Sequence, residues 1–96
     1  MVIAQLTIFP TDKGVSVGKY VKKAVKAIYD ADVKYQHGAM STTFEAENID
    51  KIFEVVKKAR DILSDQGCNR IYITLTIDDR KDKEASIETK LKRISE

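Results

Sequence analysis

Residue types that are scarce in this chain exclude whole classes of structure. Tryptophan is absent, and cysteine, histidine and proline each occur once among the 96 residues. Because Cys68 has no partner within the chain, an intrachain disulfide is excluded, and we expect a reducing, cytoplasmic location. One cysteine and one histidine also cannot complete an ordinary zinc site, so we expect no bound metal.

Long apolar runs are missing as well. A membrane-spanning helix needs roughly 18 or more apolar residues in a row, and no segment of the sequence approaches that length. The segment before Pro10 has neither the basic start nor the small-residue cleavage site of a secretory leader. We therefore expect a single soluble domain, residues 1–96, with no membrane partner.

Neither sign of charge dominates the chain. Lysine and arginine total 17, aspartate and glutamate total 15, and the net charge is +2. Nucleic-acid-binding domains concentrate positive charge, and RNA-recognition sheets combine it with several stacking aromatic residues. Only Phe9 and Tyr72 could stack bases on the predicted sheet, so we expect no nucleic-acid partner.

The first third of the chain predicts a strand, a helix and a second, short strand. Apolar residues alternate over residues 2–10, and Pro10 ends the strand because it has no amide donor. Ser16 is positioned to cap a helix that ends near residues 30–32. The apolar stripe of this helix comprises Val17, Val21, Ala24, Val25 and Ile28, and a solvated face carries Lys19, Lys22, Lys23 and Lys26. Residues 33–36 alternate again, and Gly38 ends that strand.

The stretch from His37 to Asn48 is the predicted centre of the fold. It reads as a strand that passes directly into a helix, because Asn48 is a good N-cap and the apolar period changes after it. Ser41, Thr42, Thr43 and Glu45 make this strand unusually polar. Such groups need partners in a covered sheet, and a ligand or a second subunit can supply them. His37, beside Gly38, is interpreted as a turn residue.

The second half of the chain predicts two more helices and the clearest strand. The stripe of the helix after Asn48 comprises Ile49, Ile52, Phe53, Val56, Ala59 and Leu63, and Gln66-Gly67 ends it. Residues 70–78 alternate, with the isoleucines and Leu75 facing inward. A charged turn follows at residues 78–83, where opposite charges are expected to pair. A last helix carries Ile87, Leu91 and Ile94.

This order of elements predicts an α+β fold of the ferredoxin-like βαββαβ type, with a four-stranded antiparallel sheet and an extra C-terminal helix. Right-handed crossovers place both long helices on one face of the sheet and leave the other face open. The open face would carry Ile3, Gln5, Thr7, Phe9, Ser41, Thr43, Glu45, Tyr72, Thr74 and Thr76. A mixed, nearly uncharged surface of this kind is typical of an interface, so we expect a homodimer formed through it. The C-terminal helix is expected to dock on the sheet rim or on a neighbouring subunit.

Motifs along the chain carry a family resemblance. The opening strand ends in Pro10, the first helix is entered through Ser-Val-Gly-Lys-Tyr-Val at residues 16–21, and residues 40–45 read Met-Ser-Thr-Thr-Phe-Glu. The last strand ends in Ile-Asp-Asp-Arg-Lys-Asp-Lys at residues 77–83. With these motifs the chain resembles the small thiamine-binding proteins of the MTH1187-like group (UPF0045/DUF77), relatives of YkoF. The resemblance implies a ferredoxin-like fold, homodimers and homotetramers paired through their sheets, and binding of thiamine or its hydroxymethylpyrimidine moiety without catalysis.

The resemblance also implies a ligand site. Thr42 and Glu45 are its leading residues, and Ser16, Val17 and Thr11, near the start of the first helix, are weaker candidates. An aminopyrimidine offers an amine donor and ring-nitrogen acceptors, which a carboxylate and a hydroxyl can meet. A carboxylate also suits the thiazolium cation of thiamine.

Two features of the central stretch work against this site. The family has glycines where this chain has Ser41 and Ala46, and the added side chains would narrow a pocket there. Strict alternation also places Thr42 and Glu45 on opposite faces, so that a bulge or a partner subunit must bring them to one ligand. The alternatives are a locally satisfied Thr42 and a subunit-interface carboxylate at Glu45.

Other functions remain open at this point. Acylphosphatases share the predicted fold, but residues 11–14 are a poor substitute for their glycine-rich phosphate loop, so we expect no enzyme. A structural or regulatory homo-oligomer with no small ligand is the remaining alternative. The sequence barely separates it from the thiamine-binding hypothesis.

Overall fold

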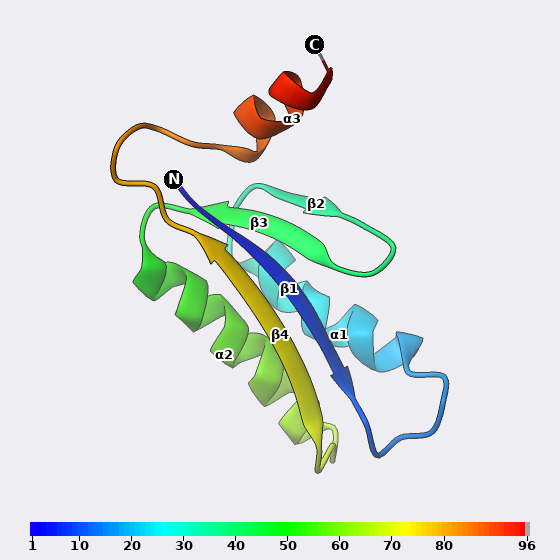
Figure 1. Cartoon of the computed structure of the whole chain (residues 1–96). Coiled ribbons are helices and arrows are strands. Elements are labelled where there is room, and N and C mark those ends of the chain that lie inside the picture. The colour runs from blue at the N-terminus through cyan, green and yellow to red at the C-terminus, as the bar shows by residue number, and fades with distance from the viewer. Residues whose placement is uncertain (96) are drawn as a thin grey trace.

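The fold consists of one sheet, two helices packed on it and a third helix at one end (Figure 1). A computed structural model describes residues 1–95. The elements in chain order are β1 (Val2–Pro10), α1 (Gly18–Asp30), β2 (Tyr35–His37), β3 (Thr42–Ala46), α2 (Ile49–Asp65), β4 (Ile71–Asp78) and α3 (Ile87–Ser95). The four strands lie in the order β2-β3-β1-β4, and all neighbours are antiparallel. The predicted ferredoxin-like α+β plan with a C-terminal helix is confirmed.

The central strand β1 defines the two faces of the sheet. Ala4 pairs with Phe44 on one side and with Ile77 on the other, and these residues face the helices. Ile3 pairs with Glu45 and belongs to the opposite, open face. Figure 1 looks onto this open face, with α1 and α2 behind the sheet. The predicted assignment of β1 residues to the two faces is therefore correct.

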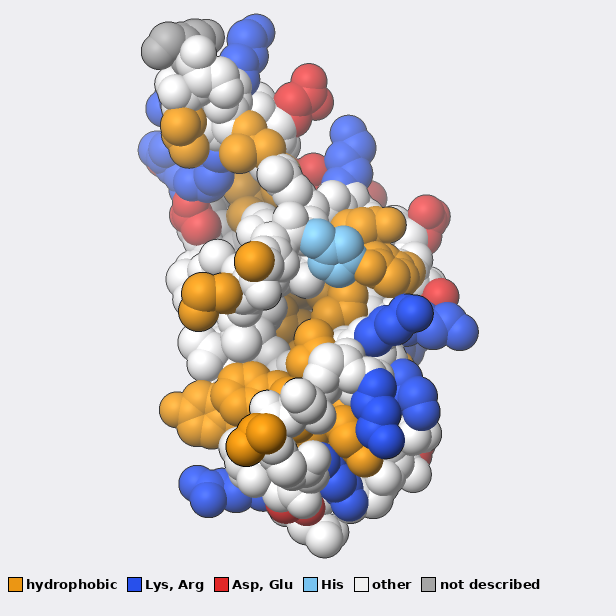
Figure 2. Space-filling view, turned by 90° about the vertical axis from the view of Figure 1, so that its right-hand side faces the viewer, with side chains coloured by type: hydrophobic (Ala, Val, Ile, Leu, Met, Phe, Trp, Pro, Cys, Tyr) orange, Lys and Arg blue, Asp and Glu red, His pale blue; other side chains and the backbone are white. Residues whose placement is uncertain are grey.

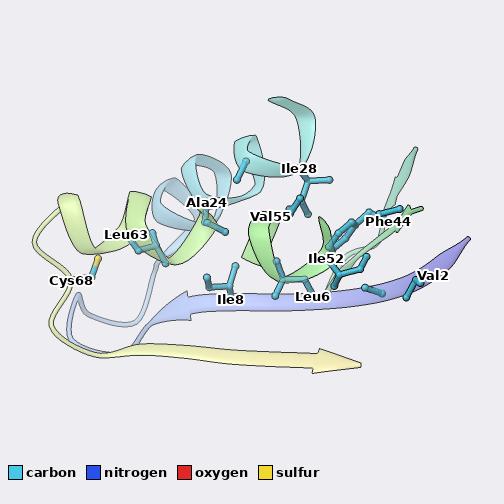
Figure 3. Packing of buried hydrophobic residues seen from close by; sticks show 14 residues of the cluster. Val2, Leu6, Ile8, Ala24, Ile28, Phe44, Ile52, Val55, Leu63 and Cys68 are labelled. Carbon is cyan, nitrogen blue, oxygen red and sulfur yellow. The ribbon is translucent and has the colours of Figure 1, made fainter. Parts of the chain in front are cut away.

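The core fills the layer between the sheet and the two long helices. Leu6 and Ile8 point from β1 towards residues of α1 and α2 (Figure 3). Phe44, Ile28 and Ile52 are completely buried, and each such side chain contributes about 1.5–3 kcal/mol to folding. These contacts hold α1 and α2 in place behind the sheet.

The start of α1 differs from the prediction. Val17, not Ser16, is the N-cap residue, and no side chain caps the helix. Ser16 is exposed and lies one position too early in the chain to act as the cap. The amide groups of the first turn are therefore left without a side-chain acceptor among the described residues.

The second strand also begins later than predicted, at Tyr35 instead of Val33. Asp32 adopts the left-handed conformation, with a φ of 56°. The turn at the end of α1 therefore continues past Ala31, and the chain becomes a strand only after Lys34.

The buried face of α2 is rotated from the predicted stripe. Val55 is buried, whereas Phe53 is 50% exposed and Ile49 is 37% exposed. The buried residues are Ile52, Val55, Ala59 and Leu63. Ile49 and Phe53 lie outside the row that packs on the sheet and α1, although the apolar period includes them.

The C-terminal helix α3 begins over one end of the open face. Ala85 is buried, and Ile3, on the open face, is only 6% exposed. Ser86 and Thr89 cap the helix start reciprocally, because Thr89 N donates to Ser86 Oγ and Ser86 N donates to Thr89 Oγ1, both at 3.1 Å. Leu91 and Ile94 border a hollow of about 350 Å³ together with residues of the open face, and Ile94 is 80% exposed. The helix therefore docks on the sheet rim, one of its two predicted positions.

None of the helices within residues 1–95 combines the length and the apolar character needed to cross a membrane.

Candidate functional site

A cleft of about 550 Å³ opens between α1, the end of β1 and the loop that joins β2 to β3. We call it the α1 cleft. Its lining residues are Leu6–Phe9 of β1, Val17, Gly18, Val21, Lys22, Val25 and Tyr29 around α1, and residues 37–42. Figure 2 looks onto this side of the molecule and shows hydrophobic side chains in the hollow below the pale blue histidine.

The cleft exists because β1 is longer than its neighbour. Pairing between β1 and β3 ends where Leu6 meets Thr42, but β1 continues to Pro10 beside β4. The last residues of β1 therefore have no strand on the β3 side. Helix α1 covers this gap from behind, and its residues Val21 and Val25 become part of the wall.

Hydrogen bonds to β1 hold the loop that borders the cleft. Gln5 Nε2 donates to Ser41 Oγ at 3.0 Å, and Thr7 Oγ1 donates to the Met40 carbonyl at 3.1 Å. Within the loop, Gly38 N donates to the Ser41 carbonyl at 2.8 Å. A Cβ at position 38 would lie 3.2 Å from that same oxygen. Glycine thus permits the tight closure of this loop.

Thr42 is the most buried polar residue of the cleft, at 4% exposure. It faces the helices and pairs across the hairpin with His37. Its Oγ1 lies 3.1 Å from His37 Nδ1, and the other ring nitrogen, Nε2, is hydrogen-bonded to the Tyr29 hydroxyl. His37 is therefore not a simple turn residue, because it joins Thr42 to α1.

The cleft is apolar with a cationic rim. Leu6, Ile8 and Val25 are among its lining residues, and no aspartate or glutamate of residues 1–95 lines it. Lys22 is exposed at the α1 side. The other lysines of α1 are exposed as well, in agreement with the predicted solvated face. A neutral, flat ligand with hydrogen-bonding groups on its edge suits such a lining better than a cation does.

Glu45 lies elsewhere. It lies on the open face, where it is buried with only 4% exposure, and its Oε2 accepts a hydrogen bond from Ile87 N at 3.3 Å. A carboxylate at the first amide of α3 is favoured by the partial positive charge of the helix start. Glu45 also borders a separate hollow of about 570 Å³, beside Lys34 and Asn48. One chain therefore does not bring Thr42 and Glu45 together.

Of the three weaker candidates, one lies at the α1 cleft and two lie outside it. Val17 lines the α1 cleft, whereas Thr11 and Ser16 are exposed and do not line it. Thr11 N donates to the Arg70 carbonyl at 2.9 Å, which ties the loop after β1 to the start of β4. Only Val17 and Thr42 of the five candidate residues share one cavity.

The side chains of Ser41 and Ala46, which were expected to narrow the ligand site, do not close the cleft. Ser41 lines it and accepts the hydrogen bond from Gln5, while Ala46 is buried opposite Val2 in the core. The cleft has a volume of about 550 Å³ with the Ser41 side chain in its lining, and Ala46 does not line it.

The shifted ionisable groups lie outside the cleft. The amide of Asn69 donates to Asp12 and lowers the pKa of that carboxyl. The ion pair of Arg80 with Asp82 lowers the pKa of Asp82, so the charged turn is internally paired as expected. Within residues 1–95, no group of three histidine, cysteine or acidic side chains is arranged to hold a metal ion.

Comparison with known proteins gives a consistent result. The family model described as "Thiamine-binding protein" matches residues 4–95. The UPF0045 protein MJ1052 of Methanocaldococcus jannaschii is 44% identical over 99% of this chain and 93% of its own length. A UPF0045 protein of Methanothermobacter thermautotrophicus is 36% identical over all of this chain and 98% of its own.

Solved structures agree with these sequence matches. The crystal structure of MJ1052 superposes with a TM-score of 0.87 at 43% identity, over 98% of this chain and 95% of that one. A Thermotoga maritima protein, provisionally assigned to thiamine biosynthesis or salvage, gives a TM-score of 0.81 at 26% identity, over 97% of both chains.

Proposed function

The chain belongs to the thiamine-binding protein family, and from this premise we propose that it is a non-catalytic protein that binds thiamine or its hydroxymethylpyrimidine moiety. The family is named for binding rather than for a reaction. The Thermotoga maritima relative, with its provisional assignment to thiamine biosynthesis or salvage, is consistent with the same ligand class.

The observation that carries the proposal is the α1 cleft. Its volume of about 550 Å³ lies within the range of roughly 300–1,000 Å³ that is typical of small-molecule sites. An aminopyrimidine ring has apolar faces and hydrogen-bonding atoms on its edge, and the cleft offers aliphatic walls with the Thr42 hydroxyl between them. Val17 is one of these walls.

The charges at the cleft support one orientation of thiamine. The thiazolium ring is a cation, and Lys22 lies at the cleft without any lining carboxylate among the described residues. Like charges repel, so the neutral pyrimidine occupies the cleft and the thiazolium points away from Lys22. Hydroxymethylpyrimidine alone then contains the part of the ligand that is recognised.

In this proposal, Glu45 can contact the ligand only from a second copy of the chain. The register of β3 with β1 is continuous from Ala46 to Thr42, so no bulge turns Glu45 towards the α1 cleft. Thr11 and Ser16 belong to the loop between β1 and α1, and the last residue of this loop, Val17, lines the cleft. Their contacts with a ligand would be at its outer end.

We also propose that the protein is a homodimer through the open sheet face and assembles further into a homotetramer. Phe9 and Tyr72 stack on that face with ring centroids 5.5 Å apart, and Tyr72 is 52% exposed. The cytoplasm remains the proposed location, because the one thiol, Cys68, is buried and has no partner for a disulfide within the chain.

Calorimetric titration with thiamine and with hydroxymethylpyrimidine tests the ligand. Micromolar or tighter binding is expected for both compounds. Thr42→Val removes the hydroxyl but keeps the shape of the side chain, and should weaken binding about tenfold, the effect of one lost hydrogen bond. Thr43→Val is the matched control, since it makes the same change one residue along β3 on the opposite face.

The outcomes separate the alternatives. Failure of both compounds to bind would reject the ligand and leave a homo-oligomer without a small ligand. Equal losses in the two threonine variants would place the site outside the α1 cleft. Glu45→Gln keeps an oxygen for Ile87 N while removing the charge. If this variant binds thiamine more weakly but binds hydroxymethylpyrimidine as before, the Glu45 carboxylate faces the thiazolium. If its affinity for both compounds is unchanged, the only role of Glu45 is its contact with α3.

A further inference from the structure

A chain of three side chains crosses from the last turn of α1 to the polar group of the cleft. The Tyr29 hydroxyl is hydrogen-bonded to His37 Nε2, and His37 Nδ1 lies 3.1 Å from Thr42 Oγ1. All three residues line the α1 cleft. Because His37 and Thr42 are paired in the hairpin, the backbone itself holds the imidazole beside the hydroxyl.

The direction of these hydrogen bonds follows from the chemistry of the groups. A neutral imidazole has one donor nitrogen and one acceptor nitrogen, and the bond made by one nitrogen sets the role of the other. The imine nitrogen of imidazole is a better acceptor than a phenol oxygen, whose lone pair is shared with its ring. Tyr29 therefore donates to Nε2, and the proton of His37 resides on Nδ1.

The consequence reaches Thr42. A protonated Nδ1 donates to Thr42 Oγ1, so the threonine hydrogen is not used by the histidine and is free for another acceptor. In the opposite tautomer, Nδ1 would accept the Thr42 hydrogen, and the hydroxyl would offer only lone pairs. The position of one proton on His37 thus decides what Thr42 presents to the cleft.

We propose that Tyr29 and His37 are positioning residues that fix the Thr42 hydroxyl as a hydrogen-bond donor in the α1 cleft. The cleft then selects a ligand with an acceptor at this point, which is a ring nitrogen of an aminopyrimidine and not its exocyclic amine. This inference deepens the proposed function and rests on it for the identity of the ligand. The tautomer of His37 is independent of that identity.

A matched control lies in the same aromatic cluster. Tyr35 packs against Tyr29 with ring centroids 4.8 Å apart and against His37 with centroids 5.6 Å apart. Its hydroxyl makes no hydrogen bond with any other side chain among the described residues. Tyr29→Phe and Tyr35→Phe each remove one hydroxyl from this cluster and keep its rings, but only the first breaks the chain to Thr42.

Nitrogen-15 NMR of the imidazole reads the tautomer directly. The chain has one histidine, so the spectrum recorded in alkaline buffer contains a single imidazole. We expect the proton on Nδ1 in the unmodified protein and in Tyr35→Phe, and a shift towards Nε2–H in Tyr29→Phe. A proton on Nε2 in the unmodified protein, or a tautomer unaffected by Tyr29→Phe, would overturn the proposal.

Titration with hydroxymethylpyrimidine completes the test. Tyr29→Phe should weaken binding about fivefold, because the donor of one hydrogen bond is lost, and Tyr35→Phe should not change the affinity. Equal affinities in all three proteins, with the tautomer as expected, would reject the positioning role but leave the proposed function intact. If the unmodified protein does not bind the compound, the proposed function fails, and the NMR spectra alone decide the direction of the hydrogen bonds.

Discussion

Asp12 fastens the loop after β1 to the turn before β4. Its Oδ2 accepts a hydrogen bond from Asn69 N at 2.8 Å, and this bond lowers the pKa of the carboxyl below its ordinary value of 3.8. A carboxyl with a lowered pKa in the folded state stabilises that state above pH 3.8. The contribution disappears as the pH falls through the lower pKa of the folded protein.

Replacing Asp12 tests this linkage. Asp12→Ala should lower the melting temperature at neutral pH, because Asn69 N loses its acceptor. The decrease should be small, because Asp12 is exposed to solvent. The difference from the unmodified protein should shrink in acid, below the folded pKa of Asp12. Asp65→Ala, at another exposed position, is the control for loss of a surface charge. A difference that persists unchanged in acid would show that the Asn69 contact is not the cause.

At the level of single residues, the sequence could predict faces but not partners. Alternation in β3 correctly predicted that Thr42 and Glu45 lie on opposite faces, because side chains alternate strictly along a strand. The roles of His37 and Tyr29 were not predictable in this way. Contact between His37 and Thr42 depends on the hairpin register, and contact with Tyr29 depends on how α1 packs on the sheet.

Among the helices, α2 has the clearest local start signal. Asn48 has an extended backbone, and its Oδ1 accepts from Lys51 N at 2.9 Å. Removal of such a cap typically costs about 1 kcal/mol. We therefore expect Asn48→Ala to lower the free energy of unfolding in urea by about 1 kcal/mol, because a backbone donor of the first turn loses its acceptor.

Asn48→Asp is the matched control for this prediction. Aspartate keeps an acceptor oxygen in the same position, and its charge suits a helix N-terminus. Its stability should be at least that of the unmodified protein. If Asn48→Ala proves as stable as Asn48→Asp, the hydrogen bond to Lys51 is not what holds the start of α2.

Elements with strong end signals were predicted closely, and those without were not. Asn48 and Gly67 bracket α2, and the structure places the helix at Ile49–Asp65 between them. Helix α1 has no comparable cap, and its start was predicted one residue too early. The turn at Asp32 requires a left-handed residue that is not glycine. Nothing in the residue type requires that conformation, so the start of β2 was misplaced.

At the scale of the whole molecule, the sheet has one covered and one open face. Helices α1 and α2 lie behind it, and α3 lies at the end of the open face that carries Ile3 and Glu45 (Figure 1). The order of the elements and the right-handed crossovers predicted this layering, but not which part of the open face α3 would contact. The remaining part of the open face carries the stacked pair of Phe9 and Tyr72.

This uncovered part of the sheet makes the proposed dimer testable. Burying aromatic side chains such as Phe9 and Tyr72 contributes about 1.5–3 kcal/mol each, and a lysine in their place would have to be desolvated. Tyr72→Lys should therefore lower the mass measured by light scattering coupled to gel filtration, to the 10.9 kDa of the single chain where the unmodified protein is a dimer and to a smaller assembly where it is a tetramer. Ser64→Lys adds the same charge at an exposed position of α2 and should leave the mass unchanged.

An unmodified protein that runs at 10.9 kDa at every concentration would reject the dimer. A Tyr72→Lys variant that keeps the multimeric mass would instead place the interface away from the open face.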